Sequence, residues 1–81
     1  MGDLGGSRVH EIGGAVKQLY SLQRVRRSGW NGNGIWLALQ IPDANSKMTL
    51  PYVYMSTAEG QLSPWLCSQT DLLAIDWQLK D

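Results

Sequence analysis

Residue types that often carry chemistry are scarce in this sequence. Its 81 residues include 1 cysteine, Cys67, and 1 histidine, His10. One thiol excludes a disulfide within the chain, and two soft ligands are too few for a zinc site, so we expect neither a metal nor a cofactor. A chain without disulfides also suits a reducing cytoplasm.

Long apolar runs are lacking as well. No stretch approaches the roughly 20 apolar residues that a membrane-spanning helix needs. The amino-terminal residues have neither the basic start nor the apolar core of a signal peptide. We therefore expect no membrane association and no export.

An excess of charge of one sign is also absent. The 7 basic and 7 acidic residues give a net charge of 0, which argues against nucleic acid as the main partner. The charges are unevenly distributed, because residues 1–40 hold five basic and two acidic side chains while residues 41–81 hold two basic and five acidic ones. This asymmetry fits a local anion pocket or a subunit interface, and equally two solvated faces.

The chain length allows one domain of 9.0 kDa. The glycine-rich residues 1–8 are expected to be a flexible leader, and residues 9–81 a single domain. A domain of this size buries only roughly 60% of its unfolded surface, so we expect copies of the chain to associate.

Apolar residues recur at helical spacing near the amino terminus. The pattern predicts an amphipathic helix over residues 9–22, with Ser7 as its N-cap. Gly13 and Gly14 weaken this helix, since each glycine costs about 1 kcal/mol relative to alanine, and they let another element approach closely.

Two apolar segments follow, with a turn between them. Residues 23–28 and 35–41 are predicted to be strands of a hairpin, because two Asn-Gly pairs lie in the intervening residues 29–34. Residues 42–50 have the composition of a loop.

The second half of the chain predicts another hairpin. Residues 52–57 and 61–66 flank the turn residues 58–60, and Pro64 indicates an edge strand or a bulge.

A short helix is predicted to begin after Ser68, whose side chain accepts the amide proton of Asp71, and to run through Ala74. Residues 75–79 are expected to form the last strand. The resulting fold class is α+β, with one amino-terminal amphipathic helix packed on an antiparallel sheet of about five strands and a short helix before the last strand.

Catalytic groups are hard to assemble from these residues. Cys67 and His10 are the only candidates for a nucleophile and a base, but no third group orients them, and Cys67 is expected to be a small buried apolar residue. Helix capping explains Asp71, and Asp76 is expected to lie exposed on the terminal strand. General acid–base chemistry is unsupported.

Aromatic residues form an unusual set, with 4 tryptophans, 3 tyrosines and no phenylalanine. Such rings stack on nucleobases while their polar atoms donate hydrogen bonds, although core packing is the commoner role for any single ring. Trp30 lies inside the glycine-rich turn and would be exposed unless a ligand or another subunit covers it. Arg24, Arg26 and Arg27 precede the turn, so at least one should reach Trp30.

The amide groups at the start of the predicted helix 68–74 offer a further place for an anion.

Several motifs resemble those of the second type of phage Thoeris anti-defence protein, a small sponge family. They are Arg27-x-Gly29-Trp30-Asn31-Gly32, Pro51-Tyr52, the stretch Met55 to Gly60, Pro64-Trp65-Leu66 followed by Ser68-Gln69-Thr70-Asp71, and Asp76-Trp77. The resemblance runs from about residue 9 to residue 79. Departures from the family pattern occur at Gly13-Gly14, Cys67 and Ile75.

The resemblance implies a protein without enzymatic activity. It would bind and hold a cyclic ADP-ribose isomer made by a TIR-domain enzyme, in the cytoplasm of the infected bacterium, and it would assemble as a tetramer with ligand pockets between subunits. Cyclic dinucleotides, alone or in addition, are the alternative ligands. An enzyme that degrades the messenger and a single-strand nucleic-acid binder are more distant alternatives.

A set of ligand-binding residues follows from these arguments. Trp30 or Trp65 is expected to stack on the adenine, and Arg27 with the amides of residues 68–71 to hold the pyrophosphate. Four polar side chains are expected to contact ribose hydroxyls. The complete set is Arg27, Trp30, Asn31, Trp36, Tyr52, Thr57, Trp65, Ser68, Gln69, Thr70 and Asp71, of which Asn31, Thr57, Gln69 and Asp71 are assigned to the ribose.

Overall fold

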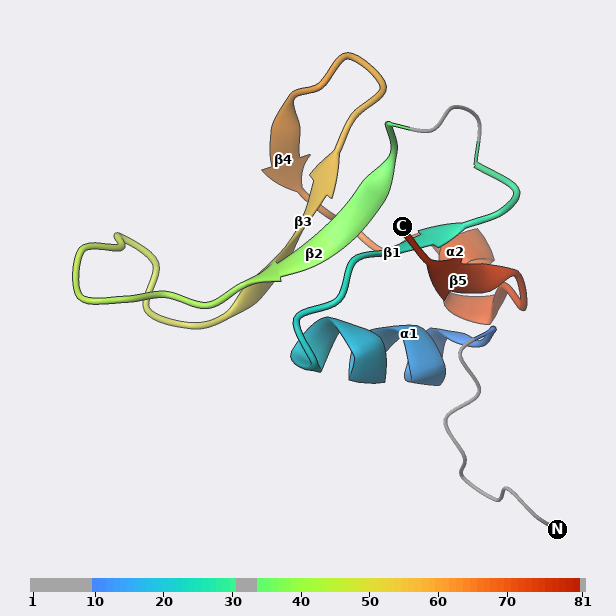
Figure 1. Ribbon diagram of the computed structural model, residues 1–81, viewed down its shortest axis with the longest axis horizontal. Helices are drawn as coiled ribbons and strands as arrows, with labels where there is room; N and C mark the ends of the chain where they lie inside the picture. Colours follow the sequence, from blue (N-terminus) through green and yellow to red (C-terminus); the bar gives the residue numbers. More distant parts are fainter. Residues whose placement is uncertain (1–9, 31–33, 81) are drawn as a thin grey trace, which may run out of the picture.

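A computed structural model describes residues 10–30 and 34–80 of the chain. Within these residues it contains two helices and five strands, and the strands form one antiparallel sheet in the order β4-β3-β2-β1-β5 (Figure 1). The elements are α1 (Ile12–Tyr20), β1 (Val25–Arg27), β2 (Trp36–Gln40), β3 (Tyr52–Ser56), β4 (Leu62–Pro64), α2 (Gln69–Leu73) and β5 (Trp77–Leu79). The predicted fold class is confirmed.

The sheet is built from the two predicted hairpins and a returning last strand. β2 and β3 pair along five residues, from Trp36 opposite Ser56 to Gln40 opposite Tyr52. β5 adds to the free edge of β1, where Arg27 lies opposite Trp77. The last strand therefore brings the carboxyl-terminal residues beside the first strand.

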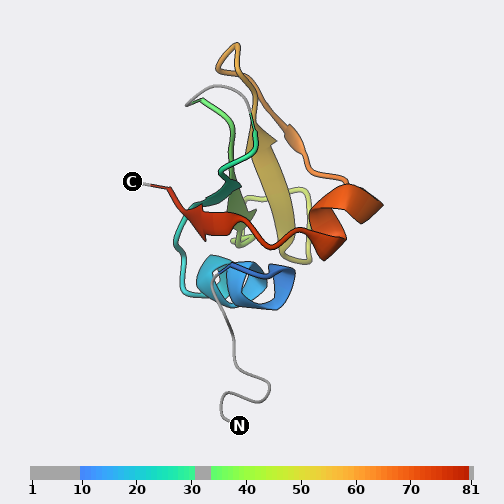
Figure 2. The same ribbon diagram turned by 90° about the vertical axis from the view of Figure 1, so that its right-hand side faces the viewer.

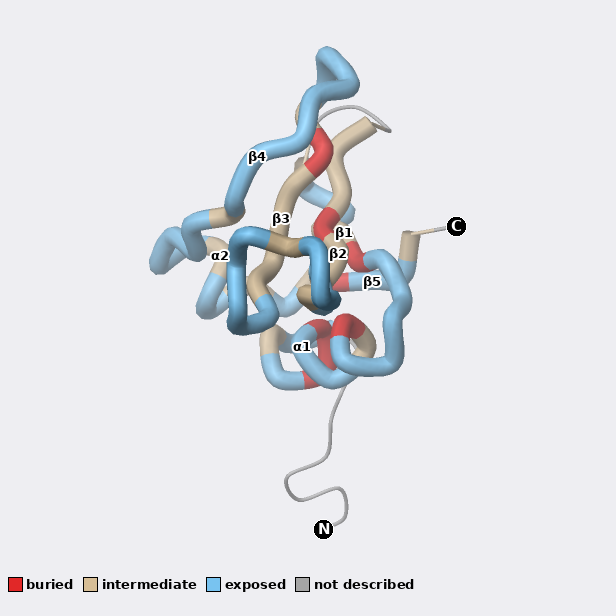
Figure 3. The backbone as a smooth tube through the Cα atoms, turned by 90° about the vertical axis from the view of Figure 1, so that its left-hand side faces the viewer, coloured by how far each residue is buried: buried red, intermediate tan, exposed pale blue. Residues whose placement is uncertain are grey.

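The core lies between α1 and one face of the sheet (Figure 2). Residues paired directly across strands point to the same face, so Val25, Leu37 and Met55 share one face while Trp36 and Tyr54 point to the other. Burial is concentrated in α1, β1, β2 and β5 (Figure 3). The buried apolar residues are Ala15, Leu19, Val25, Leu37 and Trp77.

The first helix differs from its prediction at its start. It begins after Glu11, whose backbone is extended, and the side chain of Glu11 makes no capping hydrogen bond. The predicted cap, Ser7, lies outside the described residues. Gly14 is buried, in line with the close approach expected at the glycine pair, whereas a side chain at Gly13 would meet open space.

The end of α1 is a Schellman motif. The amide of Gln23 bonds to the carbonyl of Gln18 at 3.0 Å, and the amide of Leu22 to that of Leu19 at 2.9 Å. Leu22 occupies the left-handed position that glycine usually takes, with φ of 63°. This strained residue turns the chain from α1 into β1.

No helix in the described part of the chain is both long enough and apolar enough to cross a membrane.

Candidate functional site

An open cleft lies where the segment after β1, strand β3 and the segment between β4 and α2 meet. Its volume is about 590 Å³, which is in the range of small-molecule sites. We call it the tryptophan cleft. It is lined by Gly29, Trp30, Ile35, Met55, Trp65, Leu66 and Asp71.

The two tryptophans of the cleft are positioned by a third. Trp30 and Trp65 are each half-buried and stand edge-on to the buried Trp77, with ring centroids 5.3 and 6.0 Å away. Edge-to-face contact of this kind fixes the angle of a ring as well as burying its surface. The covering that we expected for Trp30 from a ligand or a second subunit is thus supplied in part by Trp77 of the same chain.

Asp71 connects the cleft to the helix beside it. Its Oδ1 accepts hydrogen bonds from Arg27 Nη1 at 2.9 Å and from Trp30 Nε1 at 3.3 Å. Its amide donates to Ser68 Oγ at 3.0 Å, which confirms the predicted N-cap. Its carbonyl accepts from Trp77 Nε1 at 3.1 Å. All three polar groups of Asp71 therefore help to hold the cleft.

Asp76 is less exposed than the sequence predicted. Its carboxylate is 27% exposed and pairs with Arg27, with Nε 2.7 Å from Oδ1. The hydrogen bond from Arg27 is the main reason that the pKa of Asp76 lies below its usual value. The same contact, followed by that to Asp71, raises the pKa of Arg27. The partner was missed because it lies 49 residues away in the chain.

Arg27 is held between two carboxylates. It donates from Nε, Nη1 and Nη2 to Asp76 and Asp71, which uses three of the five N–H donors of a guanidinium. Arg26 is the arginine that reaches Trp30, with Nη2 3.2 Å from its carbonyl oxygen. The expectation that one of these arginines would reach Trp30 is confirmed.

Three predicted site residues line a second opening rather than the tryptophan cleft. This opening has a volume of about 560 Å³. It is lined by Arg27, Gln69, Thr70, Leu73, Ala74, Ile75 and Asp76. The two openings are linked by the ion pair between Arg27 and Asp71, since each opening is lined by one member of the pair.

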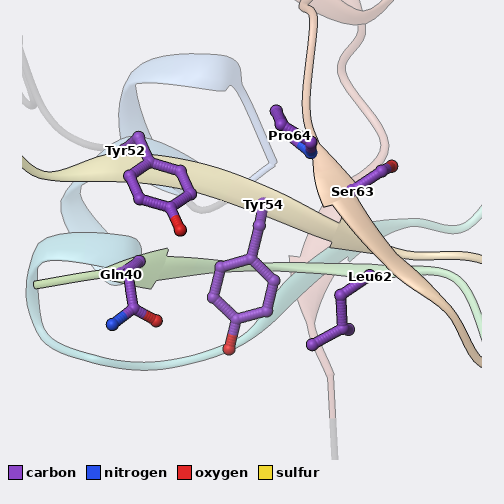
Figure 4. Close-up of a pocket in the computed structure, with 6 residues that line it drawn as sticks. All are labelled: Gln40, Tyr52, Tyr54, Leu62, Ser63 and Pro64. Atoms are coloured by element: carbon purple, nitrogen blue, oxygen red, sulfur yellow. The ribbon is translucent and has the colours of Figure 1, made fainter. Parts of the chain in front are cut away.

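Two further predicted residues lie on the opposite face of the sheet. Trp36 packs edge-on against Tyr54, and the guanidinium of Arg24 lies 5.0 Å from the Trp36 ring. Tyr52 lines a small pocket of about 180 Å³, where it points the same way as Tyr54 and Gln40 (Figure 4). The structure therefore separates Trp36 and Tyr52 from the tryptophan cleft.

The remaining predicted site residues are Thr57 and Asn31. Thr57 closes the turn between β3 and β4, because its Oγ1 and its amide bond to the backbone of Gln61 at 3.1 and 2.8 Å. It lines none of the openings described above. Asn31 lies outside the described residues.

Cys67 and His10, the two groups considered for catalysis, each form a hydrogen bond with a backbone carbonyl. Cys67 is exposed rather than buried, and its Sγ bonds to the carbonyl of Ser68. Desolvation of the sulfur raises the pKa of this thiol, opposite to what an activated nucleophile needs. His10 bonds through Nδ1 to the carbonyl of Trp77 at 3.3 Å. The described residues contain no group of acidic, histidine or cysteine side chains suited to a metal.

Sequence reasoning missed the apolar part of the cleft. Gly29, Ile35, Met55 and Leu66 were not among the candidate residues, although Gly29, Met55 and Leu66 belong to the motifs that carried the family resemblance. Those motifs were the available signal. Polarity alone does not identify a residue whose role is to shape a cleft wall.

The chain is thus a small α+β domain with an aromatic cleft beside a buried tryptophan. Residues 10–80 match the family model described as a Thoeris anti-defense 2-like domain. A curated relative, Thoeris anti-defense 2 of Bacillus phage SP01, is 32% identical over 81 residues, which cover 84% of this chain and 91% of the relative. The chain belongs to the Thoeris anti-defense 2-like family, and this membership supports a phage anti-defence role against Thoeris.

Proposed function

We propose that this protein binds a cyclic ADP-ribose isomer made by a TIR-domain enzyme and holds it without cleaving it. Sequestration in the cytoplasm of the infected bacterium would keep the Thoeris effector inactive. The observation that carries the proposal is the tryptophan cleft, in which two half-buried rings stand beside a carboxylate that already bonds to one of them. The rings offer a stacking surface to a nucleobase, and the carboxylate offers a hydrogen-bond acceptor to a sugar hydroxyl.

The adenine is assigned to Trp30 or Trp65. Stacking on an aromatic side chain contributes about 1 to 3 kcal/mol for each base. The bonds from Arg27 and Trp30 both reach Oδ1 of Asp71, so we assign Oδ2 to a ribose hydroxyl. Asn31, Thr57 and Gln69 remain proposed contacts to the ribose.

The pyrophosphate is assigned to Arg27 and to the amides around Ser68, Gln69 and Thr70. Arg27 would bind the pyrophosphate through the N–H groups that do not donate to Asp71 or Asp76. Nanomolar retention requires about 12 kcal/mol of binding free energy, more than one stacked base and one charged hydrogen bond supply. Several contacts must therefore act together.

A second copy of the chain is the proposed source of further contacts. Leu66, on the wall of the cleft, is 90% exposed, and Leu73 and Ile75 are each 75% exposed. We propose that copies meet over these three residues, the leucine–isoleucine patch, and that the assembly is a tetramer with ligand pockets between subunits. Burial of exposed apolar side chains is the usual driving force of such association.

Cyclic dinucleotides are the alternative ligand class, alone or in addition. The opposite sheet face favours this candidate, because Arg24 over Trp36 and the Tyr52 pocket place a cation and aromatic rings together there. Trp36 and Tyr52 are proposed contacts only on that face.

Calorimetry with a panel of cyclic ADP-ribose isomers and cyclic dinucleotides tests the proposal. We expect Trp30→Ala and Trp65→Ala to weaken binding of the preferred isomer at least about tenfold, since each removes a stacking surface. Trp36→Ala is the matched control on the opposite face, and it should keep wild-type affinity for that isomer. Full affinity in both folded cleft variants would refute the site.

A second measurement separates sequestration from degradation. After incubation and heat release, we expect intact messenger in near-stoichiometric amount. A changed product in catalytic excess would refute binding without cleavage and establish an enzyme.

A further inference from the structure

We propose that Asp76 is a positioning residue that holds Trp30 in place at the tryptophan cleft by binding the chain segment just before it. Asp76 itself does not line that cleft. Its effect on ligand affinity rests on the proposed function above, whereas its effect on Trp30 concerns the ligand-free protein.

The contacts of Asp76 fall on three consecutive residues. Oδ1 accepts from Arg27 Nε at 2.7 Å, and Oδ2 accepts from the amide of Gly29 at 2.8 Å and from Ser28 Oγ at 3.4 Å. The carbonyl of Asp76 also accepts from the amide of Ser28 at 3.0 Å. Asp76 thereby contacts all three residues that lead into Trp30.

The segment is shaped for this contact. A Cβ on Gly29 would lie 2.9 Å from Asp76 Oδ2, closer than real side chains come. The carboxylate is therefore seated directly against the backbone, at a position that only glycine fits without movement. The amide of Trp30 bonds to the carbonyl of Arg27 at 3.1 Å, which closes the turn behind Gly29.

The carboxylate also reaches the Trp30 ring through Arg27. Arg27, held by Asp76, donates to the same Asp71 oxygen that accepts from Trp30 Nε1. The ring is thus restrained at its nitrogen by Asp71 and through its backbone by Asp76. A side chain that is already ordered loses less conformational entropy when a ligand binds, and the affinity gains accordingly.

The test compares Asp76→Asn with Glu59→Gln, an exposed carboxylate-to-amide change in the turn between β3 and β4. In the ligand-free protein, hydrogen exchange of the Gly29 amide and the Trp30 indole is measured by NMR, with the Trp36 indole as internal reference. We expect Asp76→Asn to speed exchange at Gly29 and Trp30 about tenfold or more and to leave Trp36 unchanged. Glu59→Gln should change none of the three.

Affinity for the cyclic ADP-ribose isomer that binds the wild type is measured on the same samples. We expect Asp76→Asn to lose about tenfold in affinity, because an unrestrained Trp30 must be ordered on binding, and Glu59→Gln to lose none. Unchanged exchange at Trp30, or faster exchange with unchanged affinity, would overturn the positioning role. If the wild type binds no isomer of the panel, the proposed function fails, and the exchange rates still decide whether Asp76 orders Trp30.

Gly29→Ala keeps the inference testable if Asp76→Asn does not fold. It pushes the carboxylate off the backbone while keeping its charge and Arg27. We expect the same rise in exchange at Trp30, and wild-type exchange in this variant would likewise overturn the proposal.

Discussion

At the scale of single residues, the site depends on two aspartates with different tasks. Asp71 accepts hydrogen bonds from the indole N–H groups of Trp30 and Trp77. Asp76 instead accepts from the backbone amide of Gly29 and from Arg27. Arg27 stands between them and neutralises part of their charge. This arrangement makes Arg27 mainly an internal support, with only part of its guanidinium left for the proposed contact to a phosphate.

The ion pair of Asp76 predicts a defined response to acid. Because the pKa of Asp76 is lower in the folded chain than its ordinary value of 3.8, the unfolded chain binds more protons in the window just below pH 3.8. The stability from this pair is therefore fully present above pH 3.8 and is lost as the pH falls through the lowered pKa. Urea denaturation from pH 7 to pH 2.5 measures this loss.

The Asp76→Asn variant has no such carboxylate to protonate. We expect its unfolding free energy to start lower at neutral pH and to fall less in the acid range than that of the wild type. Glu59→Gln should fall as steeply as the wild type. An equal acid decline in Asp76→Asn and in the wild type would show that this pair does not contribute.

At the scale of elements, local sequence patterns predicted short-range features correctly, but they could not predict which distant strands pair. The cap of α2 was predicted because Ser68 and Asp71 are three residues apart, and the bond between them is present. The pairing of β5 with β1 joins residues about 50 positions apart, which no local pattern reveals. Asp76 was misjudged for that reason, since its exposure depends on which strand lies beside it.

Helix ends show the same limit at shorter range. The periodic pattern over residues 9–22 predicted α1, but the helix covers only Ile12–Tyr20. Apolar residues beyond a helix continue the pattern without continuing its hydrogen bonds. Leu22 is such a residue, because it serves the Schellman turn and is 70% exposed.

The end of α1 offers a stabilising substitution. Leu22→Gly should raise the unfolding free energy by about 0.5 to 1 kcal/mol, because glycine adopts positive φ without the Cβ clash and little apolar burial is lost. Thermal and urea denaturation measure the change. Leu22→Ala removes the same exposed side chain but keeps the clash, so it should not stabilise, and equal stability of the two variants would contradict the argument.

At the scale of the whole molecule, the balance between core and surface favours association. The described chain buries few large apolar side chains, while many, among them Leu50, Leu66, Leu73 and Ile75, lie at the surface. A small domain with a thin core gains stability when such residues are covered by another copy. The proposed leucine–isoleucine patch adjoins both openings, so covering it would also enclose a ligand.

The patch can be tested with two matched leucines. Leu73 and Leu50 are each 75% exposed, but Leu73 lies in α2 beside Arg27 and its opening, whereas Leu50 belongs to the loop between β2 and β3. Leu73→Glu should dissociate the proposed tetramer, because a carboxylate is costly to bury in an apolar interface. Sedimentation measures the mass, and calorimetry measures the affinity for the proposed ligand, a cyclic ADP-ribose isomer. We expect the mass to fall below that of a tetramer and the affinity to drop at least about tenfold, while Leu50→Glu keeps both the mass and the affinity of the wild type.

Two outcomes would contradict this prediction. A Leu73→Glu protein of wild-type mass would place the interface elsewhere on the surface. A Leu73→Glu protein that dissociates yet binds with wild-type affinity would mean that a single copy completes the pocket.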